Sequence, residues 1–176
     1  MEKRDERSPY GKFAAMIVTS MVVMYALMYL NTYELSHVLW SETRVYMTFI
    51  MGAAMAVIML SFMQSSYKNK QVNMSIYVGS LAVFVLALYL VRSQVTVQDE
   101  SWMRAMIPHH SIAILTSERA EITDMRVRAL ADDIIEAQRR EIKEMDWLLE
   151  DIRENGEAAT QGEAEARPVP EFEAEP

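Results

Sequence analysis

The sequence has no cysteine. Disulfide bonds, thiolate nucleophiles, iron–sulfur clusters and covalently attached haem are therefore excluded, and histidine, methionine and carboxylate side chains are the only metal ligands on offer. The chain is also short of basic residues, with 17 against 25 acidic ones and a formal net charge of −8. Phosphate binding requires a basic face, so we do not expect a nucleic-acid-binding protein.

Signatures of the common enzyme classes are missing as well. No His-Glu-x-x-His motif of zinc proteases, serine nucleophile motif, phosphate loop or dinucleotide turn is present. The Glu-x-x-His motif of di-iron bundles is also absent, because Met106 and Ile107 stand three positions before His109 and His110. We therefore expect that the protein is not an enzyme.

What the chain does have is three long uncharged runs, 13–33, 45–67 and 71–91. Each run is long enough to cross a hydrocarbon core of about 30 Å as a helix of roughly 20 residues. The sequence predicts a three-span transmembrane region over 13–92, preceded by a cytoplasmic N-terminus, 1–12. A cleaved signal peptide is not expected, because the first run is too long and no small-residue cleavage site follows it.

Basic residues beside these runs predict the orientation. The N-terminal segment has four and the connection between the second and third runs has two, whereas the first connection has only Arg44. We expect a bacterial inner-membrane protein whose N-terminus is cytoplasmic and whose residues from Arg92 onward are periplasmic or extracellular. His37 in the first connection lies on that same outer side. It could supply a metal ligand, although a lone loop histidine usually does not.

From Val97 onward, seam residues recur at alternating spacings of four and three, as in helices that pack along one stripe. The pattern predicts a helical hairpin over 97–153, interrupted at 122–125, with Thr123 or Asp124 capping the second helix. Its short connection makes the two helices antiparallel. The first seam contains Asp99, Met103, Met106, His110, Ala113, Ser117 and Ala120; the second contains Val127, Ala131, Ile134, Gln138, Glu141, Met145, Leu148 and Ile152.

Facing residues in such a hairpin have numbers that sum to roughly 248, which brings the polar residues of the two seams together. The expected neighbours are His110 with Gln138, Met106 with Glu141, and Met103 with Met145.

Soft ligands dominate this part of the seam and favour Cu(I) over Mg²⁺ or Ca²⁺. Zinc is the less favoured metal, because thioethers bind it poorly. Gln138 or Glu141 would accept a hydrogen bond from one imidazole nitrogen and leave the other nitrogen for the metal. We expect a protein that binds, buffers or delivers copper, with copper-handling proteins as partners. The candidate ligands are His109, His110, Met103, Met106 and Met145.

A structural interpretation stays open beside this one. An unpaired carboxylate or amide between helices costs several kcal/mol, so His110, Gln138 and Glu141 could form a satisfied polar layer that fixes the register. The hairpin would then be a dimerisation module on a membrane anchor, without a metal.

Further apolar residues beside the seam widen the stripe beyond what one partner helix covers. We therefore expect a homodimer in which two hairpins form a four-helix bundle. The tail 154–176 is rich in Glu, Ala and Pro, and is expected to be disordered because it has too little apolar surface to bury. The widening residues are Ile107, Ile114, Leu130, Ile135, Ile142 and Leu149.

Several short motifs recur together between Asp99 and Ile152. They are Met106-Ile-Pro-His-His110, Ala113-Ile114, Arg128-Ala-Leu-Ala131, Ile134-Ile135, Ala137-Gln138, Glu141-Ile142 and Met145. This combination resembles the bacterial family called domain of unknown function 305 (DUF305).

The resemblance implies a ferritin-like helical bundle and periplasmic copper binding and resistance through His and Met, with His109, His110, Met106 and Met145 as carried-over ligands. The chain departs from many relatives at Leu115, where they have methionine, and at Met125, where they have proline. The expected fold is thus all-α: three transmembrane helices followed by an antiparallel hairpin, which is half of a ferritin-like four-helix bundle.

Overall fold

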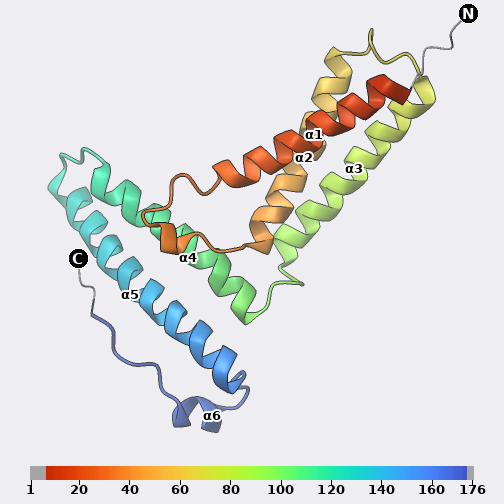
Figure 1. Cartoon of the computed structure of the whole chain (residues 1–176). Coiled ribbons are helices and arrows are strands. Elements are labelled where there is room, and N and C mark those ends of the chain that lie inside the picture. The colour runs from red at the N-terminus through yellow and green to blue at the C-terminus, as the bar shows by residue number, and fades with distance from the viewer. Residues whose placement is uncertain (1–6, 174–176) are drawn as a thin grey trace, which may run out of the picture. The chain divides into compact units, whose positions relative to one another are not determined.

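The computed structural model describes residues 7–173 and is helical, with no strand in that range (Figure 1). This confirms the expected all-α class. A short 3-10 helix, η1 (Leu35–His37), lies in the connection between α1 and α2. The α-helices are α1 (Arg7–Leu27), α2 (Glu42–Phe62), α3 (Lys70–Ser93), α4 (Asp99–Arg119), α5 (Met125–Asn155) and α6 (Gln161–Ala166).

The chain divides into two compact units. The first, the membrane unit, contains α1, α2 and α3. The second, the hairpin unit, contains α4, α5 and α6 together with the connection Asn31–Ser41, which leaves α1 and returns to α2. Two segments distant in the sequence therefore belong to the same unit.

All three long helices of the membrane unit, Pro9–Leu27, Glu42–Phe62 and Lys70–Ser93, are long and apolar enough to cross a membrane. The first helix ends at Leu27 rather than at Tyr33, where the uncharged run ends. Beyond it, Arg44 donates a hydrogen bond to the Met28 carbonyl and lies 4.2 Å from the centroid of the Tyr29 ring. The amides of Met28, Tyr29 and Leu30 satisfy carbonyls of the last turn, and Arg44 satisfies the carbonyl that follows the helix.

In the membrane unit, α2 packs against both α1 and α3. The α1–α2 contact is close at Gly52, where an added Cβ would lie 2.5 Å from the Met21 sulfur. A glycine at this position lets the two helices approach, as small residues do between membrane helices. Further along the same face of α2, Leu60 belongs to a buried cluster with Phe13 and Tyr67.

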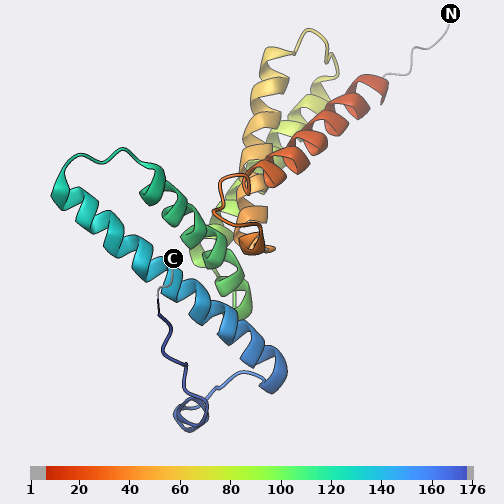
Figure 2. The same ribbon diagram turned by 60° about the vertical axis from the view of Figure 1, so that its left-hand side comes forward.

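In the hairpin unit, α4 and α5 lie side by side and antiparallel (Figures 1 and 2). Asp124 caps α5 as expected, because its carboxylate accepts a hydrogen bond of 2.9 Å from the Arg126 amide. The Arg126 side chain and amide together hold the pKa of Asp124 at about 2. Pro108 is buried inside α4, and the helix continues past it from Asp99 to Arg119.

The tail departs from the expected disorder. Residues 161–166 form α6, whose start has a reciprocal capping box between Thr160 and Glu163. Beyond α6 the chain runs back along α5 (Figure 2), where Arg167 pairs with Asp151 at 2.5 Å and Lys143 donates to the Glu173 carbonyl at 2.9 Å. Capping and long-range ion pairing, rather than buried apolar surface, order this segment.

Candidate functional site

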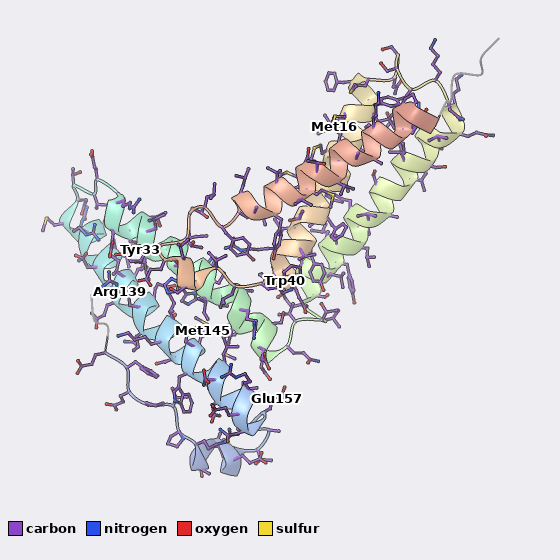
Figure 3. All side chains as sticks on the ribbon, viewed as in Figure 1. Met16, Tyr33, Trp40, Arg139, Met145 and Glu157 are labelled. Atoms are coloured by element: carbon purple, nitrogen blue, oxygen red, sulfur yellow. The ribbon has the colours of Figure 1, made fainter. Side chains whose placement is uncertain are left out.

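A buried cluster joins the middle of α4 to the C-terminal half of α5. It contains two of the three expected thioethers, Met103 from α4 and Met145 from α5; Met145 is labelled in Figure 3. Met106 is partly buried and packs against this cluster. The remaining buried members are Ile107, Ile114 and Ile142. The three methionines predicted to be ligands are thus brought to one region of the hairpin.

His110 is buried beside this cluster and is hydrogen-bonded through both ring nitrogens. Its Nδ1 lies 2.9 Å from the Met106 carbonyl oxygen, and its Nε2 lies 2.7 Å from a carboxylate oxygen of Glu141. Both neighbours are acceptors, so the arrangement suits a doubly protonated ring, or a ring with one proton beside a protonated carboxyl group. The structure pairs His110 with Glu141 rather than with Gln138.

The difference of three residues between Glu141 and Gln138 is one step of the seam. Seam positions alternate by three and four, so sliding one helix by a single step keeps apolar residues facing one another. The sequence pattern therefore predicts which residues lie on the seam better than it predicts the facing pairs. Gln138 is half-buried on the same helix.

Metal binding by His110 would require one of these hydrogen bonds to break. The Glu141 side chain is 42% exposed, whereas that of His110 is 9% exposed. Glu141 can therefore turn towards solvent and free the Nε2 atom, while the Nδ1 bond to the backbone keeps the ring in place. This differs from the role that sequence analysis gave to Glu141: the Met106 carbonyl, not the carboxylate, holds the nitrogen that the metal would leave free, and Glu141 occupies the nitrogen that the metal would need.

His109 has a different position. It is exposed, and its ring centroid lies 6.0 Å from that of His110 with an angle of 64° between the planes. Adjacent residues on a helix point about 100° apart, which separates the two imidazoles. Within residues 7–173 there is no group of three or more His, Asp or Glu residues arranged to hold a metal ion. A metal in this region would depend on the thioethers.

The connection Asn31–Ser41 supplies a contact that sequence analysis missed. The Tyr33 amide donates a hydrogen bond of 2.7 Å to Ser111 Oγ, and His37 Nδ1 lies 2.9 Å from the same oxygen. Tyr33 and Leu39 also pack against the methionine-containing cluster. The available signal was Ser111 itself, a hydroxyl placed between Ile107 and Ile114 on an apolar face of α4.

A cavity of about 510 Å³ lies beside this contact. Arg139 on its wall is 5.8 Å from the centroid of the Tyr33 ring and pairs with Glu118 at 2.5 Å (Figure 3). Burial raises the pKa of Asp146, and the nearby His37 partly opposes this effect. The lining residues are Tyr33, Glu34, Ser36, His37, Ile114, Arg139, Ile142, Lys143 and Asp146.

Comparisons with known proteins agree with this division of the chain. Residues 94–174 match the family model described as Domain of unknown function (DUF305), and the match reaches beyond Ile152. An uncharacterized protein of Acanthamoeba polyphaga mimivirus is 28% identical over 144 residues, covering 78% of this chain and 93% of that protein. The residues after Val97 are fewer than half of the chain, so this match extends into the membrane unit.

No solved structure matches the chain. Methionines, one buried histidine and a carboxylate thus converge in a helical hairpin that follows three membrane-length helices, and residues 94–174, slightly less than half of the chain, match the DUF305 family model.

Proposed function

We propose that this chain is a membrane-anchored copper-binding protein that binds Cu(I) at the methionine cluster of its hairpin and buffers or delivers the ion. The observation that carries the proposal is that Met103 and Met145, from opposite helices, share one buried cluster against which Met106 packs. Three soft thioethers in one region suit Cu(I) and are poor ligands for zinc, which is the second choice of metal.

The spacing of the polar residues supports the same region. Met106 and His110 are four residues apart on α4, and Glu141 and Met145 are four residues apart on α5, so each pair lies on one helix face. The His110–Glu141 hydrogen bond joins the two pairs. A cation among the thioethers would therefore have an imidazole and a carboxylate within reach, and these reduce the cost of removing it from water.

Each candidate residue has a distinct role in this proposal. Met103, Met106 and Met145 are the thioether ligands, and His110 joins through Nε2 when Glu141 turns away. His109, which is exposed, is an entry ligand or faces a copper-handling partner protein. Glu141 holds the imidazole in the metal-free protein, and neither Gln138 nor Glu141 binds the metal.

The proposal includes a location and an assembly. Basic residues at the N-terminus and between α2 and α3 favour a bacterial inner-membrane protein with a cytoplasmic N-terminus and a periplasmic hairpin unit. A homodimer remains part of the proposal, with exposed Trp102 and Leu130 as apolar surface. The chain itself, however, covers three of the residues from which a second copy was inferred: Ile107, Ile114 and Ile142.

A second candidate function is supported by the hydrogen bonds of His110. Because both ring nitrogens have partners, His110 and Glu141 also fit a polar layer that fixes the register of a purely structural hairpin. In that case His110→Ala destabilises the metal-free protein, whereas in the copper-binding case Met145→Leu lowers metal affinity and leaves the metal-free fold nearly unchanged.

The test is a competition titration of the full-length, detergent-solubilised protein with Cu(I) under reducing conditions, with Zn(II) in parallel. Met103→Leu and Met145→Leu conserve volume, so they remove sulfur with little loss of packing. Each is expected to weaken Cu(I) binding by about tenfold or more, a loss of about 1.4 kcal/mol. The matched control is Met125→Leu, because Met125 is 78% exposed at the start of α5. Equal affinities for the wild type and a Met103→Leu/Met145→Leu double variant would overturn the proposal.

A further inference from the structure

One face of α4 is more completely buried than a two-helix hairpin explains. Ile107, Ser111 and Ile114, at spacings of four and three, are exposed by 0%, 0% and 1%. A single partner helix covers one stripe of an amphipathic helix, and the adjoining stripe needs another element. That element is the connection Asn31–Ser41, which belongs to the hairpin unit although it lies between α1 and α2 in the sequence.

Ser111 is a buried polar contact point for the connection. Ser111 Oγ accepts the Tyr33 amide hydrogen bond at 2.7 Å and lies 2.9 Å from His37 Nδ1. A serine hydroxyl has two lone pairs and one proton, so it can serve both partners at once. Ser111 is fully buried and His37 is 9% exposed, so little water is at hand to replace either bond.

The same connection also packs against the cluster that holds the candidate copper site. Tyr33 and Leu39 pack against the cluster that contains Met103 and Met145, whose exposed fractions of 4% and 5% are those of a closed site. An ion that enters this cluster from the side of the connection has to displace Tyr33 and Leu39. Docking of the connection and access to the thioethers therefore involve the same side chains.

We propose that Asn31–Ser41 is a latch that docks on Ser111 and closes the methionine cluster, so that ion binding in the cluster and docking of the α1–α2 connection are linked. The linkage rests on the proposed function, because its ligand is the copper ion. Docking of the connection on Ser111 does not depend on that function. By reciprocity, an ion held in the closed cluster stabilises the docked latch, and loss of docking weakens ion binding by the same factor. An ion bound in the methionine cluster thus changes the stability of the docked connection Asn31–Ser41, which is joined covalently to α1 and α2.

The docking is tested without metal by hydrogen exchange of the Tyr33 amide in the full-length protein. Ser111→Ala removes the acceptor and is expected to speed exchange at Tyr33 by about tenfold, the equivalent of one hydrogen bond. Ser117→Ala, the same change six residues further along α4, is the matched control and should leave the rate unchanged. Equal rates in the two variants would overturn the latch.

His37→Ala provides a second variant should Ser111→Ala fail to fold. It leaves the Tyr33 hydrogen bond in place and is expected to give a smaller acceleration at Tyr33, with exchange in α4 and α5 unchanged. A Tyr33 rate equal to that of the wild type would count against the role of His37 in the latch.

The linkage is tested by adding Cu(I). Saturation of the wild type is expected to slow Tyr33 exchange by about fivefold or more, and Ser111→Ala is expected to bind Cu(I) more weakly than Ser117→Ala by the same factor. Tight binding with no change at Tyr33 would overturn the linkage and leave the proposed function standing. Failure of the wild type to bind Cu(I) would overturn both, while the metal-free comparison still decides whether the latch docks.

Discussion

The two units use similar helices in two different solvents. In the membrane unit, only 6% of the span residues of α1 and of α3 are buried inside the protein, against 28% for α2, so most apolar side chains face outward around one central helix. In the hairpin unit, the apolar residues gather between α4 and α5, and charged residues occupy the outer faces. Removal of apolar surface from water stabilises the hairpin, whereas lipid provides no such force between spans.

Polar contacts are also distributed differently. In the membrane unit they lie near the helix ends, as where Tyr10 donates to Asn73 at 2.8 Å and Arg44 to the Met28 carbonyl. In the hairpin unit they lie in the middle of the packed faces, at His110–Glu141 and at Ser111. Polar side chains in the middle of a helix are tolerated only where water or a partner residue completes their hydrogen bonds.

The largest effect should come from truncating the core of the hairpin. Ile107→Ala is expected to lower the free energy of unfolding by about 2–5 kcal/mol, because a fully buried side chain is lost and a cavity is left. Leu60→Ala, at an equally buried position of α2, should cost less. In a membrane or detergent the side chain leaves the protein for an apolar solvent rather than for water, so little hydrophobic transfer free energy is lost. Denaturant unfolding of each variant in the same detergent measures the two losses in the free energy of unfolding. A larger loss for Leu60→Ala would contradict the proposed difference between the two units.

Enlarging a small residue should disturb the membrane unit instead. Gly52→Val places atoms against the Met21 side chain and is expected to cost about 1–3 kcal/mol. Gly79→Val is the matched control, because its added Cβ meets no atom within 4 Å. Thermal unfolding of detergent-solubilised protein should detect the difference, and adding Met21→Ala should recover much of the loss. No recovery in the double variant would contradict the packing explanation.

Removing a polar partner in the middle of the hairpin should have a smaller effect. Glu141→Ala leaves the buried Nε2 of His110 without its carboxylate and is expected to cost about 1 kcal/mol, since water reaches the exposed side of Glu141. Gln138→Ala, one seam step away, should cost less. Urea unfolding of the metal-free protein decides between them, and a larger cost for Gln138→Ala would support the register read from the sequence.

The smallest effect concerns the helix caps and their response to pH. The lowered pKa of Asp124, about 2, stabilises the start of α5 at pH values above the ordinary aspartate pKa of about 4, and this contribution is lost as the pH falls through 2. Asn69, which caps α3, does not titrate. Amide exchange should therefore show acid fraying at Arg126 but not at Gln71. Asp124→Asn should remove the pH dependence, and fraying that persists in this variant would assign it to another group.

Local patterns predicted the parts of this structure that local forces determine. The three spans follow from uncharged runs, and the hairpin and the Asp124 cap follow from periodicity and N-cap chemistry. In the tail, the Thr160-x-x-Glu163 spacing is a capping-box signal for a helix. The prediction of disorder rested on the low apolar content and did not use this signal. The facing pairs and the latch could not be predicted, because one depends on a choice between equivalent seam steps and the other joins Tyr33 to a residue 78 positions away.

The latch has a consequence for transferring the stretch that matches the DUF305 model to another protein. The family match begins at residue 94, whereas the cover over Ser111 comes from residues 31–41. A transplant of the matched stretch alone would leave a hydroxyl and the Ile107–Ile114 face open to water, an exposed apolar patch prone to self-association. A transplanted hairpin should therefore include the connection Asn31–Ser41 at its native length.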